Sequence, residues 1–186
     1  MLRLRTLLPL LVLFALLGHA TAATRTTGEP ALFSADGYRL DRYRSPTPAS
    51  VDGAQTIDTA TLQHLLATEP QTLLIDVFRR PWLHGQFAGA EPHENIPGSL
   101  WLANVGEGAP QSLWLDYFAH HLQRASGGDR ARPIVIYCKS DCWLSWNASK
   151  RAAALGYTRL YWYRDGVDAW RQAGLPLRVA IPEPLP

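Results

Sequence analysis

Short apolar runs alternate with helical patterns along most of the chain. Residues 73–77 and 134–137 are apolar runs of strand length, typical of strands that are buried on both faces. Residues 98–103 and 160–162 are two further candidate strands. Short buried strands that alternate with helices predict an α/β fold whose sheet is mainly parallel.

The helices are indicated by apolar spacing and by their end signals. They are predicted over residues 58–68, 111–124, 146–155 and 165–173. Asp58 or Thr59 is a suitable N-cap for the first helix, and Ser145 is one for the third. Gly156 is a suitable stop for the third helix.

The N-terminus has the three parts of a secretory signal peptide. A basic start precedes an apolar run over residues 7–17, and the small-residue pattern Ala20-Thr21-Ala22 follows. The apolar run is about half of the roughly 20 residues that a membrane-spanning helix needs. We therefore expect residues 1–22 to be removed, and the mature protein to be periplasmic rather than anchored.

The rest of the chain divides into three parts by composition. Residues 23–55 are rich in Pro, Gly, Ser and charge, which predicts an irregular extension in which residues 37–44 form a docking arm. Residues 56–178 carry the α/β pattern and are long enough for one domain. Residues 179–186 are rich in proline, and we expect a loose tail.

The charge of the chain is balanced. The 186 residues include 18 Lys and Arg and 16 Asp and Glu, and removal of Arg3 and Arg5 with the signal peptide leaves 16 of each sign. A balanced charge argues against a dedicated binder of nucleic acid or of anionic membranes. We expect neither partner for the mature protein.

Both cysteines lie in one loop between a predicted strand and a predicted helix. Cys138 follows the apolar run 134–137, and Cys142 stands four residues later. Backbone N–H groups and the dipole at a helix start favour the thiolate, which is the reactive form of cysteine. We predict that Cys138 is a catalytic nucleophile and that Cys142 is its partner; the structural alternative is a buried, inert thiol.

Three interpretations of Cys142 remain open. It resolves a persulfide or sulfenic acid on Cys138, or the pair is a static disulfide, or the pair binds a soft metal such as copper with His84 or His93 as a third ligand. We favour the first, in which the protein needs no metal and no cofactor. Residues expected to contact the substrate are Lys139, Ser140, Asp141, Trp143 and Arg79.

Several motifs in this order resemble the rhodanese-like family over residues 56–177. They are Leu74-Ile75-Asp76-Val77, Asn95-Ile96-Pro97-Gly98-Ser99, the run 134–138, Ala154-Leu155-Gly156-Tyr157, Asp165-Gly166-Val167-Asp168-Ala169-Trp170 and Gly174-Leu175-Pro176-Leu177. The resemblance implies a mainly parallel sheet of about five strands with helices on both faces. It also implies that Cys138 accepts sulfur within a cradle of backbone amides from residues 139–143. Near its end, at Asp141-Cys142-Trp143, the loop has neither the glycine nor the arginine expected from many catalytic members.

A narrower resemblance rests on Cys138-x-x-x-Cys142-Trp143 together with residues 37–48 upstream. These features resemble an exported rhodanese-like subfamily found with pyrroloquinoline-quinone-dependent alcohol oxidation. This implies an accessory role, with a sulfur donor or acceptor, a thiol-containing protein, a quinoprotein dehydrogenase or a cytochrome c as partners. Two hypotheses follow: a sulfurtransferase or thiol–disulfide relay, and a non-catalytic binding module or Cu(I) carrier.

Overall fold

The computed structural model describes residues 31–186, so the predicted signal peptide and the start of the extension lie outside the described residues. The strands are β1 (Gln55–Ile57), β2 (Leu73–Asp76), β3 (Trp82–Leu83), β4 (Gln86–Phe87), β5 (His93–Asn95), β6 (Leu100–Trp101), β7 (Ile134–Tyr137), β8 (Leu160–Tyr163) and β9 (Arg178–Ala180). The helices are α1 (Thr59–Thr68), α2 (Ser112–Ser126), α3 (Trp143–Ala154) and α4 (Gly166–Gln172).

Five parallel strands form the central sheet, in the order β1-β8-β7-β2-β6. The apolar runs 73–77 and 134–137 form the neighbouring strands β2 and β7, with Asp76 opposite Tyr137. The prediction of a mainly parallel five-stranded sheet is confirmed. The strand predicted over residues 98–103 is shorter, and only β6 pairs there.

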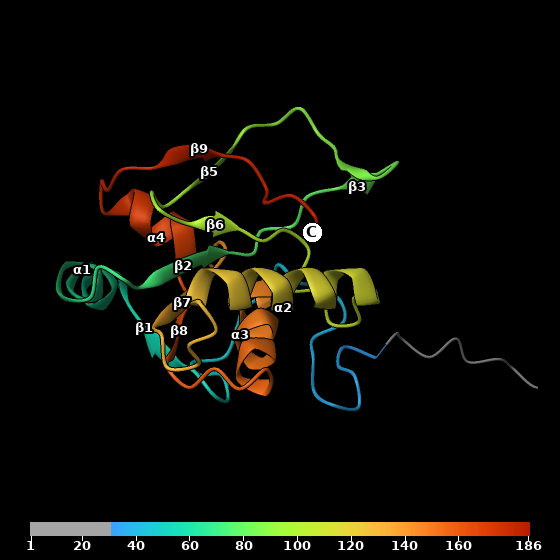
Figure 1. Ribbon diagram of the computed structural model, residues 1–186, viewed down its shortest axis with the longest axis horizontal. Helices are drawn as coiled ribbons and strands as arrows, with labels where there is room; N and C mark the ends of the chain where they lie inside the picture. The colour runs from blue at the N-terminus through green and yellow to red at the C-terminus, as the bar shows by residue number, and fades with distance from the viewer. Residues whose placement is uncertain (1–30) are drawn as a thin grey trace, which may run out of the picture. The chain divides into compact units, whose positions relative to one another are not determined.

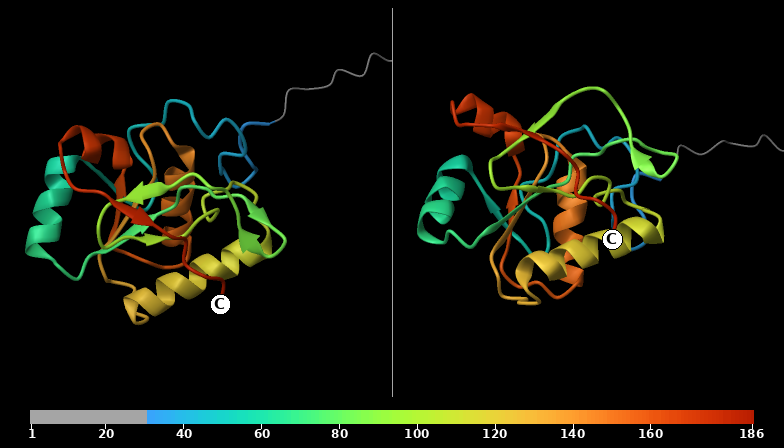
Figure 2. Two further views of the ribbon diagram at one scale, coloured as in Figure 1. Left: turned by 90° about the horizontal axis from the view of Figure 1, so that it is seen from above. Right: turned by 45° about the horizontal axis from the view of Figure 1, so that its top comes forward.

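Helices cover both faces of this sheet (Figures 1 and 2). Alternate residues of each strand face opposite ways, so Ile136 packs with side chains of α2 and α3, and Val135 packs with side chains of α1 and α4. This explains why the strand sequences are apolar throughout. The prediction of helices on both faces is confirmed.

The neighbouring strands β2 and β7 end together at the carboxyl edge of the sheet. The N–H of Val77 donates to the carbonyl of Tyr137 at 3.0 Å, which keeps the two chains side by side past their last paired residues. In open parallel sheets, ligands bind at this edge. The segments that follow β2 and β7 are therefore the place to look for a site.

The C-terminal tail packs on the domain, contrary to the expectation of a loose tail. Strand β9 pairs with β5, and the Tyr117 hydroxyl donates to the Glu183 carbonyl at 2.8 Å. The His121 ring is hydrogen-bonded to the Pro184 carbonyl at 2.9 Å. Hydrogen bonds from side chains of α2 to its backbone carbonyls thus hold this proline-rich segment in place. Within residues 31–186, no helix is long and apolar enough to cross a membrane.

Candidate active site

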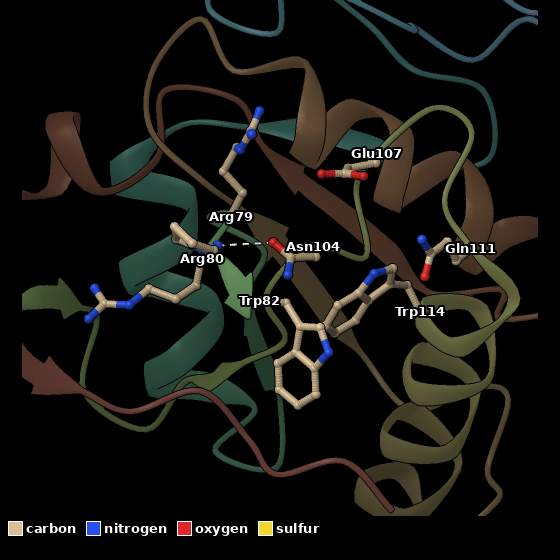
Figure 3. A pocket seen from close by; sticks show the side chains of 8 residues that line it. Arg79, Arg80, Trp82, Asn104, Glu107, Gln111 and Trp114 are labelled. Carbon is tan, nitrogen blue, oxygen red and sulfur yellow. Dashed lines mark hydrogen bonds between the residues drawn. The ribbon is translucent and has the colours of Figure 1, made fainter. Parts of the chain in front are cut away.

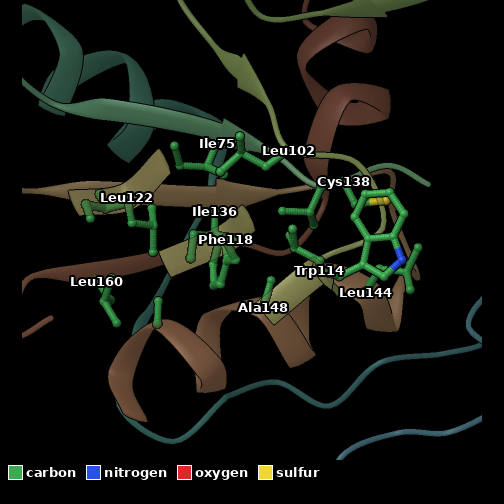
Figure 4. Packing of buried hydrophobic residues seen from close by; sticks show 14 of the residues in the cluster. Ile75, Leu102, Trp114, Phe118, Leu122, Ile136, Cys138, Leu144, Ala148 and Leu160 are labelled. Carbon is green, nitrogen blue, oxygen red and sulfur yellow. The ribbon is translucent and has the colours of Figure 1, made fainter. Parts of the chain in front are cut away.

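Cys138 is the first residue after β7, and its side chain lies in the apolar cluster between the sheet and helices α2 and α3 (Figure 4). Only 1% of the residue is exposed. Its carbonyl accepts the N–H of Val167 at 2.9 Å, at the start of α4. Gly166 approaches this carbonyl so closely that a Cβ there would lie 2.2 Å from the oxygen. The backbone at Cys138 is thus held between the end of strand β7 and the start of helix α4.

The loop from Cys138 to Cys142 is held by contacts with its surroundings. One carboxylate oxygen of Asp168 accepts both the N–H and the hydroxyl of Ser140, at 3.0 and 2.9 Å. Asp141 adopts a left-handed conformation with φ of +48°. Aspartate is one of the few non-glycine residues that enter this region readily. Asp141 therefore makes the turn without a glycine.

Cys142, and not Ser145, is the N-cap of α3, so the predicted start of this helix was wrong by three residues. The Ser145 hydroxyl lies one turn inside the helix, where it donates to the Cys142 carbonyl and accepts the indole N–H of Trp162, each at 3.0 Å. Cys142 makes no side-chain cap hydrogen bond, but the backbone N–H groups of Leu144 and Lys139 act on its sulfur to lower its pKa. Of these two residues, only Leu144 lies in the helix.

The pKa values of the two thiols are shifted in opposite directions. Burial raises the pKa of Cys138 well above its usual value, and its hydrogen bond to Cys142 adds to this. That same bond, with the Leu144 and Lys139 amides and the charge of Arg44, lowers the pKa of Cys142 to about 7. These shifts favour Cys142 as the thiol that ionises first, while the assignment of Cys138 as the nucleophile stays a prediction.

The N-terminal extension runs across this loop. Arg44 and Cys142 form an antiparallel bridge, and the Trp143 N–H donates to the Tyr43 carbonyl at 2.9 Å. The indole N–H of Trp143 donates to the Ser45 hydroxyl at 3.0 Å, and the Arg44 guanidinium donates to the Ser140 carbonyl. The extension is therefore part of the site.

A cavity of about 580 Å³ lies between the extension and the segment after β2. Its lining residues are Asp41, Arg42, Tyr43, Arg44, Ser45, Phe78, Arg79, Cys142 and Leu144. Cys142 is 1% exposed, so a reactant must enter the cavity to meet its sulfur. Cys138 does not line the cavity.

Of the predicted substrate contacts, only Arg79 lines this cavity. The Lys139 ammonium lies 4.7 Å from the centre of the Phe78 ring, and the Trp143 ring lies 4.8 Å from the Arg39 guanidinium carbon. Asp141 accepts the N–H of Thr47 at 3.3 Å. Lys139, Ser140, Asp141 and Trp143 thus make contacts that shape the loop.

Arg79 also borders a second, smaller cavity of about 220 Å³ (Figure 3). Trp82 and Trp114 form one side of it, and the side chain of Arg79 points away from these rings. The Asn104 side chain accepts the N–H of Arg80 at 2.9 Å. Arg79 therefore borders both cavities, next to the end of β2.

The two histidines considered for copper have other surroundings in the structure. His93 is paired with the buried carboxylate of Asp76 at 2.5 Å and stacks on Phe78. His84 lies in the turn between β3 and β4. Among residues 31–186, no group of three or more His, Cys, Asp and Glu side chains is arranged to hold a metal ion. The copper interpretation gains no support from this arrangement.

Sequence reasoning missed several residues that build the site, among them Tyr43, Arg44, Leu144 and Asp168. Asp168 lies in a motif that was noticed only for its resemblance, and the arm over residues 37–44 was expected to dock at an unspecified place. The aromatic residues of that arm were the one available signal.

The fold and the loop define a parallel α/β domain that presents a pair of thiols at the carboxyl edge of its sheet. A model of the rhodanese-like domain matches residues 58–173, and the chain belongs to that family. The extension that walls the cavity lies outside the matched residues. None of the curated proteins matches the chain.

Solved structures are similar to the chain at low sequence identity. The thiosulfate sulfurtransferase from Pseudomonas aeruginosa is 14% identical with a TM-score of 0.51, over 72% of this chain and 22% of that one. The polysulfide-sulfur transferase homodimer from Wolinella succinogenes is 22% identical with a TM-score of 0.45, over 68% of this chain and 79% of that one.

Proposed function

We propose that the protein is a sulfurtransferase that carries sulfane sulfur on Cys142, with Cys138 as its hydrogen-bonding partner. The observation that carries this proposal is that Cys142, and not Cys138, lines the cavity. The pKa shifts agree with it, because the pKa of Cys142 is lowered to about 7 and that of Cys138 is raised. A thiolate is the nucleophile in sulfur exchange.

The reaction needs no net oxidant. The Cys142 thiolate attacks the terminal sulfur of a donor, a new S–S bond forms, and the donor's S–S bond breaks as its remaining part leaves with the electron pair. An acceptor nucleophile then attacks the outer sulfur of the Cys142 persulfide, and the Cys142 thiolate leaves. The S–H of Cys138 stabilises negative charge on Cys142 at the start and at the end.

Mass spectrometry of the intact protein tests this proposal. Reduced protein is treated with a sulfane-sulfur donor, and the thiols are then alkylated and mapped. We expect one added sulfur atom on Cys142, its loss on treatment with cyanide, and no sulfur on the Cys142→Ser variant. If no donor loads either cysteine, the sulfurtransferase proposal is wrong, and a non-catalytic binding module becomes the better hypothesis.

We also propose that this activity serves the periplasm, as an accessory to quinoprotein alcohol dehydrogenases or their cytochrome c partners. Support comes from the signal-peptide pattern of residues 1–22 and from the motif Cys138-x-x-x-Cys142-Trp143. Mature protein from an osmotic-shock fraction should begin at Ala23. A deletion strain should lose quinoprotein-dependent growth on alcohol and regain it with the wild-type chain but not with Cys142→Ser. Normal growth of the deletion strain would contradict the accessory role.

A further inference from the structure

The cavity at Cys142 has more space and a different lining than an inorganic sulfur anion requires. Its volume of about 580 Å³ falls in the range of sites for organic ligands, roughly 300–1,000 Å³, whereas one water molecule takes about 30 Å³ in the liquid. Tyr43, Phe78 and Leu144 supply apolar surface in the same wall as the sulfur.

The charged residues of the lining favour an anion. Three arginines, at positions 42, 44 and 79, line the cavity against one carboxylate, that of Asp41. Asp41 accepts the N–H of Arg42 at 2.6 Å. Arginine binds carboxylates with paired hydrogen bonds. Apolar surface and positive charge together fit an organic body that ends in a carboxylate.

The wall that supplies these groups is held firmly. The N–H of Arg39 donates to the side-chain oxygen of Asn147, and the Asn147 amide donates to the Arg39 carbonyl, each at 2.9 Å. These bonds fix the extension on α3 just ahead of the residues that line the cavity. A preformed cavity binds a ligand without first having to order its own wall.

We propose that this cavity binds a low-molecular-weight organic thiol or persulfide that carries a carboxylate, and that the extension, residues 31–50, selects it over inorganic sulfur anions. This inference rests on the proposed sulfurtransferase function and names its substrate class. A small molecule fits better than a cysteine on a folded protein, because the Cys142 residue is 1% exposed and is met only from within the cavity. In the transfer step, the organic persulfide gives its outer sulfur to the Cys142 thiolate and leaves as the thiolate.

The binding test uses S-methylglutathione, which carries carboxylates and cannot transfer sulfur. Calorimetry on the full mature chain compares the wild type, Arg79→Gln and, as a matched control, Arg164→Gln. Arg164 pairs with Asp165 and lies outside the cavity lining. We expect Arg79→Gln to weaken binding by about tenfold, the scale of one charge-assisted hydrogen bond, and Arg164→Gln to leave it unchanged. The dimethyl ester of the same compound should bind about as weakly to the wild type as the acid binds to Arg79→Gln.

This experiment distinguishes a failure of the binding proposal from a failure of the sulfur-transfer proposal. If S-methylglutathione does not bind the wild type, or binds Arg79→Gln equally well, the inference is overturned even where sulfur loading of Cys142 succeeds. If it binds as expected but no donor loads Cys142, the cavity assignment stands and the sulfurtransferase proposal falls. In the loading assay, glutathione persulfide should react at least tenfold faster than thiosulfate at equal concentration, and equal rates would also overturn the inference.

Discussion

The thiol of Cys138 is hydrogen-bonded to the sulfur of Cys142. This bond raises the pKa of Cys138 and lowers the pKa of Cys142. Burial is the largest cause that raises the pKa of Cys138, which favours its protonated form. Cys142 is the N-cap of α3, and the hydrogen bond from Cys138 is the largest cause that lowers its pKa. In this pair, Cys138 therefore acts as the hydrogen-bond donor and Cys142 as the thiolate.

The first prediction concerns pH. The pKa of Cys142 is lowered to about 7 from 9.0, so the thiolate fraction rises with pH and is half-complete near pH 7. The rate of alkylation by iodoacetamide should rise with pH and level off above about pH 8, with the label on Cys142. A profile that keeps rising to pH 9, or a label found mainly on Cys138, would contradict the assignment.

The second prediction isolates the hydrogen bond between the thiols. Cys138→Ala removes the donor, and Cys138→Ser keeps an O–H in its place. The pKa of Cys142 should rise by roughly one unit in the alanine variant, because one hydrogen bond to a charged group contributes about 1.5 kcal/mol or more. The serine variant should stay closer to the wild type. The measurement is the midpoint of the alkylation profile, and equal midpoints in all three proteins would show that the bond does not set the pKa.

The third prediction concerns the contact of Gly166 with the Cys138 carbonyl. Gly166 has φ of +55°, and a Cβ there would meet the carbonyl oxygen at 2.2 Å. Gly166→Ala should therefore lower the free energy of unfolding by more than about 2 kcal/mol, because the alanine backbone would be strained and its Cβ would clash with the Cys138 carbonyl. Gly156→Ala is the matched control, because Gly156 has φ of +90° but open space at its Cβ. Its cost should be about 1 kcal/mol, and urea unfolding measures the difference. Equal losses would show that the close approach does not matter.

The fourth prediction concerns the Asp168 carboxylate. Asp168→Ala removes the acceptor of two hydrogen bonds from Ser140 and should lower the free energy of unfolding by about 1–2 kcal/mol. Asp168→Asn keeps a carbonyl oxygen of the same reach and should lose less than half of that. Hydrogen exchange at the Ser140 amide should quicken in the alanine variant. Unchanged exchange there would mean that Asp168 does not hold the loop.

The strands and their neighbours were predictable because their signals are local. The apolar runs that became β2 and β7 are buried on both faces, so the sequence pattern alone identified them. The loop with both cysteines was found in the same way. In contrast, the pKa shifts of the two thiols depend on burial and on charges far away in the sequence, such as Arg44. No local pattern carries that information.

The wall of the cavity was not predictable for a related reason. Tyr43 and Arg44 lie in an irregular segment with no periodicity, and their place is set by pairing with Trp143 and Cys142, about one hundred residues later. Ser145 misled the prediction of a helix start because a serine inside a helix and a capping serine look alike in sequence. Long-range backbone pairing thus decided where the wall lies.

The last prediction concerns Asn147, whose amide joins α3 to the extension. Its side chain is fully buried and bonds the N–H and carbonyl of Arg39 and the carbonyl of Gly106, each at 2.9 Å. Asn147→Ala leaves three backbone groups without this partner and should lower the free energy of unfolding by roughly 3 kcal/mol. Gln63→Ala, at an exposed position of α1, serves as the control and should change stability by less than about 0.5 kcal/mol.

The same variant separates stability from the role of the extension. In conditions where Asn147→Ala is still folded, the loosened extension should open the cavity, so Cys142 should be alkylated faster than in the wild type at the same pH. Discrimination between glutathione persulfide and thiosulfate should fall at the same time, because the extension carries two of the three cavity arginines, Arg42 and Arg44. Faster alkylation with unchanged discrimination would mean that the extension only covers the sulfur and does not select what reaches it.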